Sequence, residues 1–164
     1  MKILSIMRHA KSDQSVAQAD FDRPLNNRGR RDVPQLTRLL RPLEERPQLI
    51  LASPARRARE TAEGLAAALA PCALAFDERL YLASPQILGT VLGEQDDRYT
   101  SLLVVAHNPG LEEWLALLCG GRLQLPTAGL AALRLEVERW SQVGTGQGQL
   151  LWFFIPRLAE ARNS

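Results

Sequence analysis

The sequence predicts an α/β fold, a three-layer α/β/α sandwich with a mostly parallel central sheet. Short apolar runs typical of strands alternate with segments whose apolar residues have helical spacing. The first three runs are apolar on both faces, as in strands that helices cover on both sides. With 164 residues, 46% hydrophobic and 23% charged, the chain has the length and composition of one globular domain, expected over residues 1–164.

The parallel part of the sheet is predicted from the first two thirds of the chain. Strands are expected at 2–7, where an apolar run follows Lys2, and at 49–52 and 102–106, which are wholly apolar. Helical spacing predicts helices at 28–40, at 55–69 and, more briefly, at 85–92. Asn26 is the expected N-cap of the first helix, because its side chain can accept a hydrogen bond from a free backbone N–H.

The last third of the chain predicts a pair of strands. Residues 130–137 and 150–155 have strand character, and the glycine-rich segment 144–148 between them is typical of a loop. We therefore expect these two strands to pair antiparallel. Residues 119–129 have no clear pattern and are assigned no element.

Composition excludes several classes of protein. No apolar run approaches the roughly 20 residues of a membrane span, and the run after Lys2 is too short for a signal peptide. Acidic residues are interspersed with the 20 lysines and arginines, which argues against a nucleic-acid partner. Cys72 and Cys119 lack motif spacing, so we expect reduced thiols in a soluble, cytoplasmic protein. The sequence carries no indication of an oligomeric state.

Polar side chains follow each of the first three predicted strands. Arg8 and His9 come after the first, Ser53 and Arg57 after the second, and His107 after the third. Ligands of α/β sheets bind beyond the carboxyl ends of the strands, so both histidines of the chain fall on the expected binding edge. For a single histidine, the alternative is a buried side chain with a structural role. That alternative is much weaker for two histidines that both follow predicted strands.

The arginines and histidines that follow these predicted strands indicate a phosphate site. Guanidinium groups donate paired hydrogen bonds to phosphate oxygens. Neither histidine has the neighbouring ligands that zinc requires, so we expect no metal and no cofactor. Within the cluster Arg56, Arg57 and Arg59, helical periodicity does not decide which arginine faces the site.

His9 is the candidate nucleophile, because no Gly-x-Ser-x-Gly or P-loop pattern supplies another. A histidine can accept a phosphoryl group covalently. The neighbouring charge of Arg8 would lower the pKa of the imidazole and keep one ring nitrogen unprotonated at neutral pH.

Four ordered blocks resemble the histidine phosphatase superfamily. They are Arg8-His9-Ala10-Lys11-Ser12, Asp22-Arg23-Pro24-Leu25-Asn26-x-x-Gly29, Ala52-Ser53-Pro54-x-x-Arg57-Ala58-x-x-Thr61-Ala62 and Val105-Ala106-His107-Asn108-Pro109-Gly110-Leu111-Glu112. The compact length and the first block are similar to the SixA-type branch, which is associated with dephosphorylation of protein phosphohistidine. The resemblance implies a phosphoglycerate mutase-like fold.

The resemblance also implies a role for each matched site residue. His9 would be the phosphate-accepting nucleophile, and Arg8 and Arg57 would clamp phosphate oxygens. His107 would stabilise the transferring phosphoryl group. The catalytic set is therefore Arg8, His9, Arg57 and His107, and all but His9 also bind the substrate.

Other polar residues of these blocks are assigned no catalytic role. In this alignment Arg56 and Arg59 are ordinary residues of the helix surface. Ser53 and Asn108 are interpreted as turn or cap residues.

The segment 77–84 departs from the family pattern. SixA-like chains often have a glutamate directly after the tyrosine, and here Leu82 follows Tyr81. Asp77 or Glu78 could replace it as the general acid, or both could be exposed loop carboxylates. The sequence therefore does not assign the general acid: it is Asp77, Glu78 or neither.

The sequence thus predicts a metal-independent phosphohistidine phosphatase that acts on a phosphorylated protein through a covalent phosphoenzyme. One alternative is a phosphatase of small phosphate esters that uses the same site. Another is a non-catalytic module that binds phosphorylated protein or nucleic acid. The intact His9, Arg57 and His107 argue against this last reading, because binding alone requires no nucleophile.

Overall fold

The computed structural model describes residues 1–160 and contains a six-stranded sheet in the order β3-β2-β4-β1-β5-β6. The strands are β1 (Lys2–Arg8), β2 (Leu49–Ala52), β3 (Ala73–Phe76), β4 (Ser101–Ala106), β5 (Leu130–Leu135) and β6 (Gly148–Phe154). β1, β4, β2 and β3 are parallel to one another, β5 is antiparallel to β1, and β6 is antiparallel to β5. The mostly parallel sheet and its antiparallel last pair are therefore confirmed.

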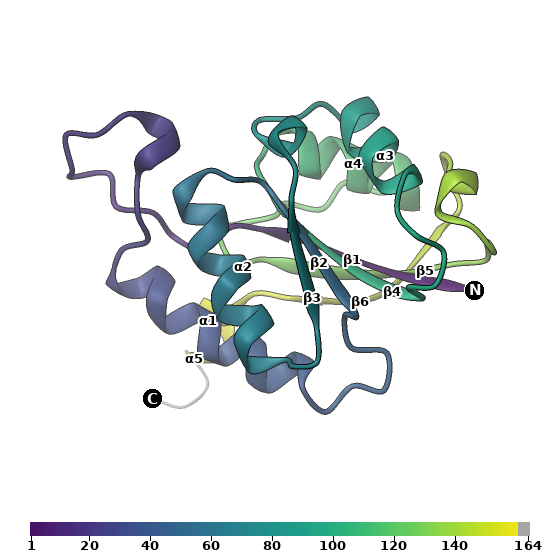
Figure 1. Cartoon of the computed structure of the whole chain (residues 1–164), viewed down its shortest axis with the longest axis horizontal. Coiled ribbons are helices and arrows are strands. Elements are labelled where there is room, and N and C mark those ends of the chain that lie inside the picture. Colours follow the sequence, from purple (N-terminus) through teal and green to yellow (C-terminus); the bar gives the residue numbers. More distant parts are fainter. Residues whose placement is uncertain (161–164) are drawn as a thin grey trace.

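Helices cover both faces of this sheet. They are α1 (Asn27–Leu40), α2 (Arg56–Ala68), α3 (Pro85–Gly93), α4 (Gly110–Cys119) and α5 (Pro156–Glu160), with short 3-10 helices η1 (Asp20–Asp22), η2 (Glu78–Leu80) and η3 (Trp140–Gln142). α3 and α4 lie on one face, and α1, α2 and α5 lie on the other (Figure 1). The three-layer sandwich is confirmed. Among residues 1–160, no helix combines the length and apolar character needed to cross a membrane.

The central strands are apolar throughout because each face contributes to a different core. In β4, Leu102 and Val104 pack in the core beneath α3 and α4, whereas Leu103 and Val105 pack in the core beneath α1 and α2. All four side chains are buried. Burying one such side chain stabilises the fold by about 1.5–3 kcal/mol, so the two cores fix the strands whose ends carry the polar residues.

Besides the short 3-10 helices, three elements are additional to those expected from the sequence: β3, α4 and the five-residue α5. β3 is a half-buried edge strand of four residues without a β-branched side chain, which gives it a weak strand signal. α4 has buried residues at helical spacing, but it begins directly after Pro109, where a Pro-Gly pair reads as a turn. The predicted strand at 130–137 ends at Leu135, and residues 120–129 contain no helix or strand.

The start of α1 fixes the loop that follows β1. The Asn26 side chain accepts a hydrogen bond from the Gly29 N–H at 2.9 Å, which confirms the predicted N-cap. The Asn26 N–H in turn donates to the Lys11 carbonyl oxygen at 2.9 Å. Gly29 lies so close to this loop that a Cβ atom on it would be 2.3 Å from the Lys11 carbonyl oxygen. Only glycine therefore allows this contact.

We expect Gly29→Ala to destabilise the protein. The added methyl group would press on backbone, and such overpacking typically costs about 1–3 kcal/mol. For a chain of this size, each kcal/mol lowers Tm by about 2–4 °C. Thermal unfolding followed by circular dichroism measures the effect. Gly121→Ala is the matched control, because a Cβ atom there meets nothing within 4 Å. Equal Tm values for the two variants would contradict this account of the loop.

Candidate active site

The sheet topology brings the four residues of the predicted catalytic set to one edge. Arg8 ends β1, His9 follows it, His107 follows β4, and Arg57 is the second residue of α2, which begins shortly after β2. β2, β4 and β1 are parallel neighbours, so their carboxyl ends lie side by side. All four side chains line a single cavity of about 290 Å³.

A hydrogen bond joins the two central side chains of this cavity. The Arg57 Nε–H donates to His9 Nε2 at 3.2 Å. On the other side of the ring, His9 Nδ1 lies 2.7 Å from the Ala10 carbonyl oxygen. A carbonyl oxygen can only accept, so Nδ1 carries the proton and Nε2 carries the free lone pair. His9 therefore presents a neutral ring whose basic nitrogen faces the guanidinium group.

Burial maintains the neutral state of His9. Its side chain is 6% exposed. The pKa of His9 is lowered to about 3, mainly because burial penalises the charged ring, and the charges of His107, Arg57 and Arg8 lower it further. At neutral pH Nε2 is consequently unprotonated, and its lone pair accepts the hydrogen bond from Arg57.

His107 lies beside His9 and is held by two polar neighbours. The two ring centroids are 5.1 Å apart. Arg57 Nη2 lies 3.3 Å from His107 Nδ1, and the Ser53 hydroxyl lies 2.8 Å from His107 Nε2. Because arginine only donates, Nδ1 accepts, and Nε2–H donates to Ser53. Ser53, interpreted from the sequence as a turn residue, thus also orients His107.

The pKa of His107 is lowered to about 4, first by burial and then by the charge of Arg57. Both histidines of the chain are therefore neutral in the folded protein at physiological pH. The positive charge of the site resides on its arginines and on Lys11.

Two arginines that line the cavity each have a buried side-chain donor without a partner among the described residues. Within residues 1–160, the buried Nε atoms of Arg8 and Arg23 have no hydrogen-bond partner. Both side chains line the cavity together with Lys11. Buried donors without partners are unfavourable, and phosphoryl oxygens would satisfy them.

The backbone of the nucleophile loop is tied to α2 through Thr61. The Ala10 N–H donates to the Thr61 hydroxyl oxygen at 3.1 Å, and that hydroxyl donates to the Arg57 carbonyl oxygen at 2.7 Å. Thr61 is fully buried. This short chain of bonds sets the separation of His9 and Arg57.

The structure settles which arginine of the cluster faces the site. The Arg57 side chain is 3% exposed and points into the cavity. Arg56 pairs with Glu60 at 2.8 Å, and Arg59 lies 3.8 Å from Glu63, both on the outer side of α2. Arg56 and Arg59 are therefore surface residues, as the family resemblance implied.

Neither candidate for the general acid lines the cavity. Asp77 accepts hydrogen bonds from the backbone N–H and the guanidinium group of Arg79, which hold the pKa of Asp77 below its usual value. Glu78 lies exposed at the start of η2. Leu82 does line the cavity, with a side chain 57% exposed and a left-handed backbone at φ 50°.

The carboxylate on the cavity wall is Asp20. It accepts hydrogen bonds from the Tyr81 hydroxyl at 2.6 Å, from Arg57 Nη2 at 3.0 Å, and from Arg23. These donors, Tyr81 foremost, hold the pKa of Asp20 well below its usual value. Sequence reasoning missed Asp20, because the 3-10 helix η1 is too short to give a periodic pattern. Only its position just before the block at Asp22 could have indicated it.

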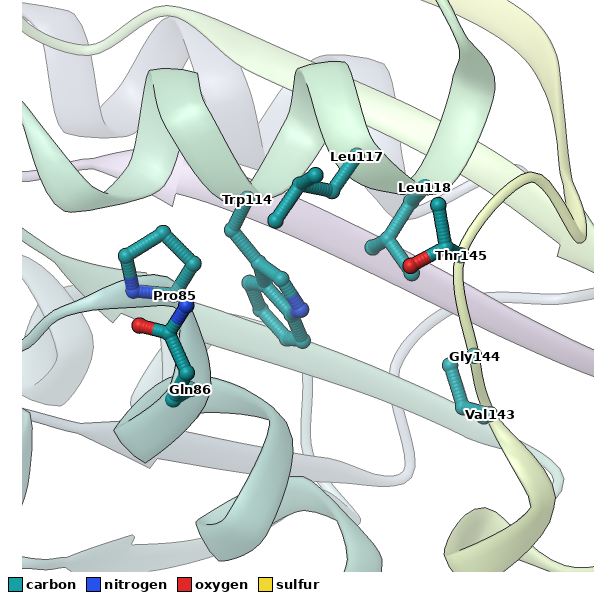
Figure 2. A pocket seen from close by; sticks show the side chains of 8 residues that line it. All are labelled: Pro85, Gln86, Trp114, Leu117, Leu118, Val143, Gly144 and Thr145. Carbon is teal, nitrogen blue, oxygen red and sulfur yellow. The ribbon is translucent and has the colours of Figure 1, made fainter.

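A second cavity lies apart from these residues. Figure 2 shows the Trp114 indole between the start of α3 and the loop at 143–145. The cavity has a volume of about 210 Å³, and none of its eight lining residues is charged. It offers no group for phosphoryl chemistry, in contrast to the cavity at His9.

We expect neither histidine to titrate between pH 8 and pH 5. Both pKa values are lowered, so the rings become protonated only near pH 4 and below. Unfolded histidines become protonated near pH ~6.5, so the free energy of unfolding should fall as the pH drops from 6.5 towards 4. Long-range 1H–15N NMR spectra should show the Nδ1–H form of His9 and the Nε2–H form of His107. A midpoint near pH 6.5 for either ring would contradict this assignment.

Comparisons with known proteins agree with this geometry. Residues 4–81 match the family model of the histidine phosphatase superfamily (branch 1). An uncharacterized protein of Mycobacterium tuberculosis is 37% identical over 165 residues, which cover 92% of this chain and 100% of that protein. The matched family segment contains the loop after β1 and the start of α2.

Solved structures extend the similarity to nearly the whole chain. A protein of Agrobacterium tumefaciens assigned as phosphohistidine phosphatase SixA has a TM-score of 0.81 and 27% identity, covering 94% of this chain and 98% of that one. A mycobacterial glucosyl-3-phosphoglycerate phosphatase shares the fold, with a TM-score of 0.66, 17% identity and coverage of 92% and 97%. The expected phosphoglycerate mutase-like fold is confirmed. Sequence, fold and family match agree that this chain belongs to the histidine phosphatase superfamily and is of the SixA type.

Proposed function

We propose that this phosphatase hydrolyses phosphohistidine on a protein substrate through a phosphorylated His9. The observation that carries the proposal is the neutral His9, whose Nε2 lone pair faces the Arg57 guanidinium at 3.2 Å. Such a nitrogen can attack a phosphorus atom that the same guanidinium holds in place. Similarity to the Agrobacterium protein assigned as SixA supports phosphohistidine as the substrate.

The first step transfers the phosphoryl group to the enzyme. Arg8 and Arg57 bind the phosphoryl oxygens, and His107 donates to them after exchanging its bond to Ser53. His9 Nε2 gives up its hydrogen bond from Arg57 Nε–H and forms a bond to phosphorus as the P–N bond of the substrate breaks. The leaving imidazole takes the electron pair of the broken bond. Positioned cations stabilise the charge on the oxygens of the transition state.

The second step releases phosphate. Water attacks the phosphorus atom of phosphorylated His9, the bond between Nε2 and phosphorus breaks, and the neutral ring is restored. We propose that no metal ion or cofactor takes part. The cationic side chains of Arg8, Lys11, Arg23 and Arg57 line the cavity and disfavour a bound metal ion.

The ionised carboxylate of Asp20 favours phosphoramidates over alkyl esters as substrates. An alkoxide leaves poorly without a proton donor, and such a donor is typically worth about 10²–10⁴-fold in rate. Asp20 is held ionised by its donors and cannot provide that proton. An imidazole, whose conjugate acid has a pKa of ~6.5, needs far less help to leave.

The mouth of the cavity suits a protein partner. Leu82 lines the cavity and is 57% exposed. Phe21, the neighbour of Asp20 in the chain, is 39% exposed and packs edge-on against Tyr81 at 5.1 Å. Exposed apolar side chains beside a phosphate site favour contact with a protein surface over a hydrated sugar. Cys72 and Cys119 are free thiols, which suits the cytoplasmic location that we propose.

Small phosphate esters are a second candidate substrate class. Lys11 and Arg23 also line the cavity and could bind a second anionic group on a small molecule. A glucosyl-3-phosphoglycerate phosphatase shares the fold, so this architecture is compatible with such substrates. Relative rates on the two classes separate these functions.

We expect a peptide phosphorylated on histidine to be hydrolysed with a higher kcat/KM than the same peptide carrying phosphoserine. The reason is the leaving group, because the cavity wall offers no protonated acid for an alkoxide. Acid-quench and base-quench experiments during turnover should detect enzyme-bound phosphate that is acid-labile and base-stable, as expected for phosphohistidine.

His9→Ala is the control for this mechanism. The variant should form no phosphoenzyme and lose turnover of every substrate. Undiminished turnover by His9→Ala would refute the covalent mechanism, and equal or faster hydrolysis of phosphoserine would refute the proposed substrate.

Arg57→Ala should lower kcat/KM by about 10²–10³-fold, the usual loss when one preorganised donor to a developing oxyanion is removed. Arg56→Ala, one residue earlier on the exposed side of α2, should retain nearly full activity. Steady-state kinetics with 4-nitrophenyl phosphate measures both variants, and circular dichroism checks their folding. A larger loss for Arg56→Ala than for Arg57→Ala would show that the clamp is misassigned.

A further inference from the structure

We propose that Asp20 selects the leaving group: it accepts a hydrogen bond from the ring N–H of a protonated phosphohistidine. This inference rests on the proposed function and assigns a specificity residue to it. It concerns the ring nitrogen that does not carry phosphorus.

The position of Asp20 is on the leaving-group side of the site. The Arg57 guanidinium contacts His9 through Nε and contacts Asp20 through its two terminal nitrogens. The His9 side chain is 6% exposed, whereas the Asp20 side chain is 47% exposed. Asp20 therefore lies across the guanidinium from the nucleophile and nearer to the entrance. In-line transfer places the leaving group opposite the nucleophile, which is also toward the entrance.

Substrate binding changes the partners of Arg57. Its terminal nitrogens donate to the Asp20 backbone oxygen and to the Asp20 carboxylate. Phosphoryl oxygens that bind this edge of the guanidinium must compete with the Asp20 carboxylate for the same donors. The Asp20 side chain is 47% exposed, so a donor on the bound substrate can reach the carboxylate that Arg57 gives up. The N–H of a protonated phosphohistidine ring supplies that donor and a compensating positive charge.

The other two partners of Asp20 keep its carboxylate ionised, so that it accepts hydrogen bonds. The Tyr81 hydroxyl and Arg23 both donate to its carboxylate, and these contacts hold its pKa low. An ionised carboxylate accepts hydrogen bonds and donates none. It can therefore bind an imidazolium N–H, but it offers nothing to the ester oxygen of an alkyl phosphate except repulsion between lone pairs.

The chemical step requires no proton transfer to or from Asp20. In the protonated substrate, one ring nitrogen is bonded to phosphorus and the other carries a proton. As His9 Nε2 bonds to phosphorus, the P–N bond breaks and its electron pair stays on the ring nitrogen. The ring leaves as neutral imidazole, with its proton still directed at Asp20.

Asp20→Asn tests the inference, because it keeps the shape of the side chain and removes its charge. Charge-assisted hydrogen bonds are about twice as strong as neutral ones. We expect kcat/KM for a histidine-phosphorylated peptide to fall about tenfold or more. We expect kcat/KM for 4-nitrophenyl phosphate, whose leaving group has no N–H and needs no proton, to fall by a smaller factor, so that the ratio of the two kcat/KM values shifts toward 4-nitrophenyl phosphate.

Asp22→Asn is the matched control. Asp22 lies on the same 3-10 helix, is exposed and is not among the residues that line the cavity. This variant should leave both rates unchanged. Retained hydrolysis of 4-nitrophenyl phosphate by Asp20→Asn also shows that the variant is folded and that Arg57 is in place.

The other outcomes each overturn a distinct claim. An equal fall on both substrates would mean that Asp20 only positions Arg57, and no fall on either would mean that it contacts no leaving group. Both results overturn the inference while leaving the proposed function intact. Failure of the unmodified enzyme to hydrolyse the phosphohistidine peptide would overturn the proposed substrate, and the inference with it.

Discussion

The site is organised by the contact between the buried Arg57 guanidinium and the unprotonated Nε2 of His9. A buried cation needs hydrogen-bond partners, because an unpaired charge in the interior is strongly unfavourable. The partners of Arg57 are the rings of His9 and His107 and the backbone and carboxylate oxygens of Asp20. The loop between β1 and α1 must therefore fold over the sheet edge. The same burial keeps both histidine rings neutral, so one arrangement serves the stability of the fold and the nucleophilicity of His9.

The surrounding structure maintains that contact through backbone rather than through the reacting side chains. Thr61 joins the nucleophile loop to α2, and Gly29 lets α1 approach the Lys11 carbonyl oxygen. Both contacts lie within a few residues of His9. Sub-ångström placement of reacting groups requires support of this kind, because a side chain alone has several rotamers.

The sequence was sufficient for the sandwich and for the four residues that the structure brings together, because both follow from strand ends on one sheet edge. The sequence was insufficient for residues whose role depends on which side chains lie near them in the folded structure. Periodicity could not separate Arg57 from Arg56 and Arg59, since all three share one helical turn. Asp20 lies in a loop without periodicity, and its importance comes from Arg57, which is 37 residues away. Ser53 has the sequence signature of a turn, although its hydroxyl also holds His107.

In this fold, phosphoryl transfer and recognition of the leaving group depend on different elements. Many enzymes build both functions from the same elements. Arg8, His9 and His107 stand at the ends of central strands that the two cores hold in place. Asp20 stands on the loop that extends beyond the sandwich between β1 and α1 (Figure 1). Surface loops tolerate sequence change far better than central strands do. Evolution can therefore exchange the residue that meets the leaving group while the phosphoryl-transfer apparatus stays constant, and a single scaffold can diversify across substrates by drift in one short segment.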